Sequence, residues 1–223
     1  MEPSEIYAAA RDRLLALGPT LHAAQVAAPL AATPPWTVLD GYRHLAGVCS
    51  DVLDGVTEGG GSPAWTATQL ASRAGCSLDD VCAEWARRGP ELDARIAAAG
   101  RAMAFPAFDA WTHGQDIRAA VGLDRPRDDP AVPALAELAL ATFAARYAAS
   151  GAPAVEVVVD GTPHRLGDGE PDVVLTTTSY EILRIIFGRR SRPQVEANDW
   201  TGDRDPVVDA LHLFDHPGRD IAD

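Results

Sequence analysis

The residue pattern of the chain changes at a Ser-Gly-Ala-Pro segment, residues 150–153. Before it, Ala- and Leu-rich stretches with helical spacing of apolar residues alternate with Pro- and Gly-containing breaks. After it, the segments AVEVVVD and DVVLTTT have the β-branched composition and alternation typical of strands. We therefore expect an α+β protein with a helical domain at residues 1–150 and a small α/β domain at residues 151–223.

Apolar periodicity and capping residues predict helices in the first domain at residues 3–17, 37–56, 77–98, 106–121 and 130–149. The stretch TEGGGSPA, residues 57–64, is expected to be a flexible surface connection. In the second domain we expect a turn at residues 161–163 and a helix over SYEILRIIFG that ends at Gly188. The segment RPQVEAND is expected to be extended, and PVVDALHLF to form a short closing helix.

Composition excludes several classes of protein. The chain has 223 residues, of which 47% are hydrophobic and 23% charged, as in ordinary globular proteins. Its net charge of -13 argues against nucleic acid or an anionic membrane as a partner, because both attract basic surfaces. No apolar run approaches the roughly 18 residues of a membrane helix, and the acidic N-terminus is unlike a signal peptide. We expect a cytoplasmic protein, either a monomer or a homodimer.

One predicted helix carries a carboxylate and an imidazole on the same face. Asp109 and His113 are four residues apart, and the face that they share continues through apolar residues. His44 lies beside the apolar stripe of the helix at 37–56 and could also turn inward. Two histidines and a carboxylate from neighbouring helices form the three-ligand set that catalytic zinc and related divalent metals use. A hydrogen-bonded Asp/His pair in a helical core has the same spacing, and spacing alone leaves both interpretations open.

A second pair of histidines lies near the C-terminus. His212 and His216 are also four residues apart, with Asp209 and Asp215 nearby. Because a Pro-Gly pair follows His216 directly, a solvated helix end is the favoured interpretation and a metal site the alternative.

The three cysteines form no C-x-x-C pair and are expected to be buried thiols: Cys49, Cys76 and Cys82.

Two adjacent arginines are candidates for substrate binding. Arg189 and Arg190 could bind an anionic substrate or the carboxylate of a thiol cofactor with planar guanidinium geometry. They could equally offset the dipole at a helix C-terminus. Asp40, one turn before His44, could accept a hydrogen bond from its ring or serve only as an acidic first-turn residue. The tryptophans are expected to be packing residues: Trp36, Trp65, Trp85 and Trp111.

Three stretches of the chain resemble the mycothiol-dependent maleylpyruvate isomerase family of the DinB/YfiT-like metalloenzyme superfamily. They are PPWTVLDGYRHLAG around His44, FDAWTHGQDIRAAVG around Asp109 and His113, and YEILRIIFGRRS in the second domain. The resemblance implies a DinB-like four-helix bundle that binds a divalent metal, usually zinc, through His44, Asp109 and His113. It also implies a C-terminal domain of sterol-carrier-protein type.

The same resemblance implies an activity. Members of the family use mycothiol, a low-molecular-weight thiol, so we expect a metal-dependent enzyme that isomerises an electrophilic small molecule or transfers a thiol to it. A non-catalytic metal- or ligand-binding module on the same fold is the alternative. The chain departs from the family pattern at two positions: Asp109 stands where the carboxylate is commonly Glu, and Gly114 where related sequences often carry a longer polar residue.

Overall fold

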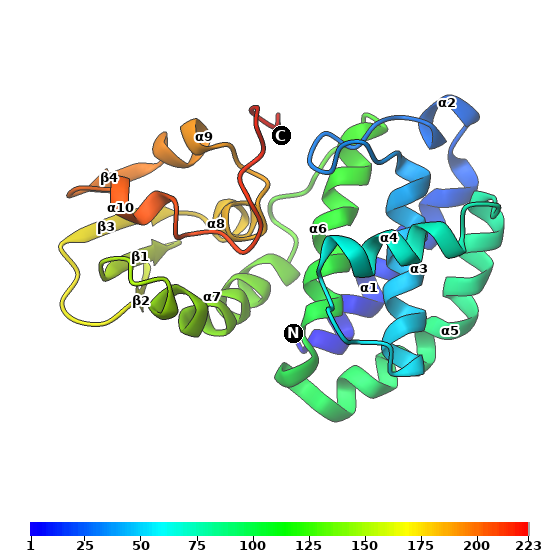
Figure 1. Ribbon diagram of the computed structural model, residues 1–223, viewed down its shortest axis with the longest axis horizontal. Coiled ribbons are helices and arrows are strands. Elements are labelled where there is room, and N and C mark those ends of the chain that lie inside the picture. Colours follow the sequence, from blue (N-terminus) through cyan, green and yellow to red (C-terminus); the bar gives the residue numbers. More distant parts are fainter. Residues whose placement is uncertain (223) are drawn as a thin grey trace. The chain divides into compact units, whose positions relative to one another are not determined.

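The computed structural model describes residues 1–222 and divides into two compact units, the first ending at Arg125 and the second beginning at Pro126 (Figure 1). The division falls before the helix α7 (Ala131–Ala149), whereas the sequence analysis places it after that helix, at residue 150. The reason is packing: α7 contacts α8 (Ser179–Ile186) and the strand β2 (Thr162–Leu166) of the second unit. Composition alone groups α7 with the other Ala-rich helices.

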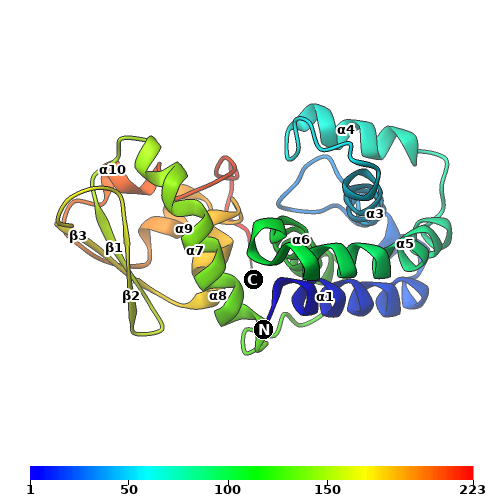
Figure 2. The same ribbon diagram turned by 90° about the horizontal axis from the view of Figure 1, so that it is seen from below.

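The first unit is built from helices. Within residues 1–125, four long helices pack so that α1 and α3 each contact both α5 and α6 (Figure 2). The shorter α4 lies on α3, and two 3₁₀ turns follow α1 and α5. The bounds are α1 (Pro3–Leu17), α2 (Ala23–Val26), α3 (Val38–Asp54), α4 (Pro63–Ser72), α5 (Leu78–Ala99) and α6 (Phe105–Ala120).

Local signals explain where these helices begin and end. Thr37 and Asp40 form a capping box at the start of α3, and Gly55 ends the helix in the left-handed conformation, with φ of 75°. Four predicted helices of this unit agree with the structure to within about two residues, the usual uncertainty of helix ends. The connection predicted at residues 57–64 is shorter, because Ser62 caps α4 and Pro63 occupies its first turn.

The helix α6 is buried on almost all sides. From Pro106 to Ile117 every residue except Asp109 is buried, and the helix packs against α1 and α3. Four of these buried residues are nevertheless polar or charged: Thr112, His113, Gln115 and Asp116. Buried polar and ionisable side chains are costly unless they are paired or bind something, and this directs attention to α6.

The second unit joins a small sheet to helices. The strand order is β2-β1-β3-β4, with β1 parallel to β3 and the two outer pairs antiparallel. Val155, Val157 and Leu175 are fully buried in the core of this unit, and Figure 2 shows α7 and α8 on the same side of the sheet. The remaining bounds are β1 (Val155–Val159), β3 (Val173–Thr177), α9 (Arg192–Glu196), β4 (Asp199–Thr201) and α10 (Asp205–Val208).

Three expectations for the second unit need correction. The turn predicted at residues 161–163 is instead an Asp160-Gly161 turn, with φ of 47° and 85°, that leads into β2. The segment RPQVEAND is not simply extended, because a capping box at Ser191 starts α9 there and only its last residues enter β4. The closing helix α10 ends at Val208, before the two histidines.

None of the helices within residues 1–222 has the length and apolar character needed to span a membrane.

Candidate metal centre

Two helices bring the three predicted ligands together. His44 comes from the middle of α3, and Asp109 and His113 from α6, which packs against α3. His44 Nε2 lies 3.1 Å from Asp109 Oδ2, and His113 Nε2 lies 3.5 Å from Asp109 Oδ1. One ligand atom from each of the three side chains lies within 4.8 Å of the others, and each side chain is at most 10% exposed.

The far nitrogen of each imidazole faces an oxygen atom. His44 Nδ1 lies 2.7 Å from Oε1 of Gln69, a residue of α4. An amide oxygen only accepts hydrogen bonds, so Nδ1 of His44 must carry the proton. His113 Nδ1 lies 3.7 Å from Asp116 Oδ2, which is longer than a hydrogen bond but places a carboxylate on that side of the ring.

The donor set fits a divalent metal ion. With the proton of His44 on Nδ1, Nε2 faces the Asp109 carboxylate as a second acceptor, and two acceptors at 3.1 Å repel each other unless a proton or a cation lies between them. Zinc–ligand bonds of about 2.0 Å in tetrahedral geometry separate the ligand atoms by about 3.3 Å. Asp109 Oδ1 lies 3.3 Å from His44 Nε2 and 3.5 Å from His113 Nε2, and both separations are close to this value.

Trp36 covers both imidazoles. Its ring lies at 5.6 Å between centroids and 22° from the ring of His113, and at 5.1 Å and 51° from that of His44. The two imidazoles meet edge to face at 4.9 Å. Trp36 directly precedes the cap of α3, so the segment that starts the helix also places the indole. Its packing role is therefore specific: it keeps water from one side of the two rings.

Two charged residues near the ligands have structural partners. Asp40 does not reach the ring of His44; it accepts hydrogen bonds from Thr37 and Arg43. Burial alone would raise the pKa of Asp40, but the Thr37 backbone and hydroxyl and the Arg43 charge lower it below its ordinary value. Arg118 donates to the carbonyl of Asp124. The sequence analysis offered Asp40 as a hydrogen-bond partner of His44, but the structure has Gln69 in that position. No sequence spacing relates Gln69 to His44.

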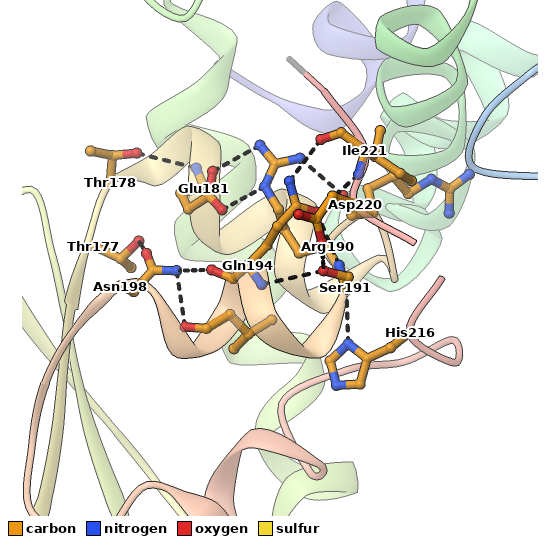
Figure 3. A network of polar contacts seen from close by, with 12 residues as sticks. Thr177, Thr178, Glu181, Arg190, Ser191, Gln194, Asn198, His216, Asp220 and Ile221 are labelled. Carbon is orange, nitrogen blue, oxygen red and sulfur yellow. Dashed lines mark hydrogen bonds and ion pairs between the residues drawn. The ribbon is translucent and has the colours of Figure 1, made fainter. Parts of the chain in front are cut away.

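The two arginines proposed for substrate binding lie in the second unit and are buried. Figure 3 shows Arg190 beside Glu181. Arg190 forms a two-point ion pair with Glu181, with N–O distances of 2.6 and 2.9 Å, and also donates to the carbonyl of Arg189. Arg189 donates to the carbonyl of Phe187. These contacts secure the end of α8, and the substrate role of the two arginines stays a prediction.

The C-terminal histidines do not gather a metal-ligand set. Their rings lie 4.2 Å apart, and His216 Nδ1 lies 3.0 Å from the carbonyl oxygen of Arg190. Within residues 1–222, His44, Asp109 and His113 form the one group of three or more such side chains with ligand atoms close enough to share an ion.

Burial raises the pKa of the Cys49 thiol, and burial together with Asp79 raises that of Cys82 to about 11. These two cysteines are therefore thiols rather than thiolates at neutral pH.

Comparison with known proteins supports the fold. No protein-family model and no curated protein matches the chain. Two solved structures are similar, both at 12% identity. A histidine-to-alanine mutant of mycothiol-dependent maleylpyruvate isomerase gives a TM-score of 0.60 over 89% of this chain and 91% of that chain. A structure of mycothiol-dependent maleylpyruvate isomerase gives 0.53 over 84% and 88%. At this identity the likeness concerns the fold, which is α+β as expected.

Proposed function

We propose that the protein is a divalent-metal-dependent enzyme that activates a low-molecular-weight thiol toward an electrophilic small molecule. The observation that carries this proposal is the set of His44, Asp109 and His113, whose ligand atoms lie within 4.8 Å of one another. The choice of thiol, mycothiol or a close analogue, is supported by the fold shared with mycothiol-dependent maleylpyruvate isomerase. Isomerisation and thiol transfer are the two reaction types that this chemistry allows.

The side chains of the first unit would prepare the site. His44 and His113 would offer neutral imidazole nitrogens and Asp109 a carboxylate oxygen, and zinc is the ion that best suits two imidazoles and one carboxylate with an open position. Trp36 shields both rings from water on one side. Asp109, shorter by one methylene than the glutamate common in the family, already lies within 3.1 to 3.5 Å of both histidines.

With metal and thiol bound, the cation would lower the pKa of the thiol, which would lose its proton and could then add through sulfur to an electrophilic double bond. After bond rotation the adduct would either expel the thiolate, which gives the isomer, or take up a proton and keep the sulfur as a thioether. Both pathways build up enolate charge when the double bond is conjugated to a carbonyl group. We propose Arg189 and Arg190 for holding a substrate carboxylate, because the guanidinium group matches a carboxylate in a two-point contact. This assignment is separate from the metal site and is tested separately below.

The finer description of the two units belongs to the same proposal. We propose that the helical unit, residues 1–125, is a DinB-like metal-binding bundle and that the unit from residue 126 is of sterol-carrier-protein type. The cytoplasm is the proposed compartment, and a monomer or homodimer the proposed state. The acidic composition supports small-molecule partners rather than nucleic acid or an anionic membrane.

The test is turnover by protein of known metal content. Tag-free protein loaded with zinc is assayed for consumption of mycothiol, glutathione or cysteine in the presence of unsaturated carboxylic acids, and for their cis–trans isomerisation. Zinc-dependent turnover that prefers one thiol is the expected result. Protein that holds about one zinc per chain but is inert with every thiol would contradict the enzymatic proposal while leaving the metal site intact.

A further inference from the structure

A buried glutamine stands behind one of the three ligands. Gln69 lies on α4, a helix that contributes no ligand itself, and only 1% of the residue is exposed. Its two amide atoms have different partners: Oε1 lies 2.7 Å from His44 Nδ1, and Nε2 donates to Asp51 Oδ2 at 2.8 Å. Asp51 lies on α3, two turns after His44.

The Asp51 carboxylate determines which way the amide points. Turning the amide by 180° would bring Oε1 of Gln69 against the carboxylate, and two acceptors would then face each other without a proton between them. The NH₂ group must therefore face Asp51, and the carbonyl oxygen must face His44. In consequence Nδ1 of His44 carries a proton, and Nε2 is the ring nitrogen that faces Asp109 and can bind a metal ion.

The backbone is arranged to let Gln69 come this close. Gly47 lies on α3 opposite α4, and a Cβ atom there would lie 2.6 Å from Cβ and 2.8 Å from Cγ of Gln69, inside contact distance. One turn beyond Gln69, Arg73 forms a two-point ion pair with Glu84 of α5, and Ser50 of α3 donates to the same carboxylate. The absence of a side chain at 47 lets α4 approach α3 closely, and the ion pair fixes the end of α4 to α5.

We propose that Gln69, oriented by Asp51, is a positioning residue that holds the proton of His44 on Nδ1 and so presents Nε2 to the metal. The inference rests on the proposed metal-dependent function and extends it to the side chains that hydrogen-bond to a metal ligand. Groups that hydrogen-bond to metal-ligating histidines fix their orientation and tautomer, and their loss typically weakens metal binding about 10- to 100-fold. The chain Asp51–Gln69–His44 has this arrangement, with an amide between carboxylate and imidazole.

The first experiment replaces Gln69 by methionine, which keeps the length of the side chain and removes the acceptor. We expect Gln69→Met to bind zinc about 10- to 100-fold more weakly in competition with a chromogenic chelator. Long-range ¹H–¹⁵N NMR of the metal-free protein at pH 8 should show Nδ1 of His44 protonated in the wild type. In the variant the proton should move to Nε2, which faces Asp109.

A matched pair of aspartates provides the control. Asp51→Ala releases the amide of Gln69, whereas Asp54→Ala, on the same helix, removes an exposed ion pair with Arg88. We expect weaker zinc binding and a mixture of His44 tautomers in the first variant and wild-type behaviour in the second. Because both changes leave Gln69 in place, they test the inference even if Gln69→Met folds poorly.

The outcomes separate this inference from the proposed function. Wild-type zinc affinity and an unchanged His44 tautomer in both Gln69→Met and Asp51→Ala would overturn the positioning role, whatever the activity of the enzyme. A wild-type protein that binds no zinc would overturn the metal-dependent function. In that event the NMR signals of the metal-free protein still decide whether Gln69 holds the proton of His44.

Discussion

The two units each contain a buried cluster of polar side chains, and the clusters differ in how their hydrogen bonds are satisfied. In the second unit, donors meet acceptors: Arg190 pairs with Glu181, Ser191 donates to Asp220, and the Arg190 carbonyl lies beside His216 Nδ1 (Figure 3). In the first unit, His44 Nε2 faces the Asp109 carboxylate while its other nitrogen is engaged by Gln69. In the second unit the cationic and anionic groups are paired with each other, and of the groups named only His216 Nε2 is buried without a hydrogen bond. In the first unit two acceptors face each other, and a proton or a metal ion between them would be favourable.

This difference shows why spacing alone cannot identify a site. Asp109 and His113 in the first unit, and His212 and His216 in the second, are pairs with the same separation of four residues. The first pair lies on a long buried helix beside a third ligand from α3. The second pair lies beyond the end of α10, where a helical face no longer relates the two residues. A third ligand from another element distinguishes the two cases.

The largest expected effect is on metal content. We expect tag-free wild-type protein to contain about one zinc per chain and His44→Ala/His113→Ala to contain none, since one carboxylate cannot hold zinc alone. The matched double variant His212→Ala/His216→Ala should keep its zinc. Elemental analysis of the three proteins after dialysis against a weak chelator makes the measurement. Equal metal in all three would remove the distinction between the clusters.

The next effect concerns stability in the second unit. Arg190→Lys keeps the charge but loses the two-point contact with Glu181, so we expect the free energy of unfolding to fall by about 1–3 kcal/mol. Zinc content should not change. Urea unfolding and elemental analysis measure the two quantities. A higher KM for substrate in this variant would support the proposed contact with a substrate carboxylate, and an unchanged KM would contradict it.

Most of the helices of the first unit could be predicted because their signals are local. The capping box at Thr37 and the apolar stripe of α3 lie within the helix that they specify. Two other elements have weak signals of this kind. The best-buried residue of α4 is the polar Gln69, and β2 buries only Leu166 among its five residues. Neither shows the apolar periodicity from which a helix or a strand is predicted.

The candidate site divides in the same way. Asp109 and His113 could be related through helical spacing, and His44 through its matching flanks, but Gln69 is 25 residues from His44 and shares no motif with it. Its role depends on the packing of α4 against α3, which is a tertiary contact. The unit boundary at residue 125 was missed for the same physical reason, since α7 is assigned to a unit by its contacts rather than by its composition.

Two helical glycines near the ligands sharpen the comparison within the first unit. We expect Gly47→Ala to lower the free energy of unfolding by about 1–3 kcal/mol and to weaken zinc binding, because its Cβ would press on Gln69. Gly114→Ala, beside His113, meets only Leu14 at 3.8 Å and should be stabilising by about 0.5–1 kcal/mol. Thermal unfolding and chelator competition test both. Equal effects of the two substitutions would contradict the close packing of α4 on α3.

The smallest expected effect is a pH dependence in the second unit. Burial and the neighbouring His216 lower the pKa of His212 below its ordinary value, more than the hydrogen bond with the Phe214 backbone and the charges of Asp215 and Asp209 raise it. The unfolded chain therefore takes up a proton at this residue at a higher pH than the folded protein does. The contribution of His212 to stability is present above about pH 6.5 and is lost as the pH falls through the lower folded value. Urea unfolding at pH 7.5 and 5.5 should show a smaller loss of stability in His212→Gln than in the wild type. The control variant His164→Gln, on β2, should lose as much stability between pH 7.5 and 5.5 as the wild type. If all three proteins lose the same amount, the surroundings of His212 in the folded protein do not change its protonation.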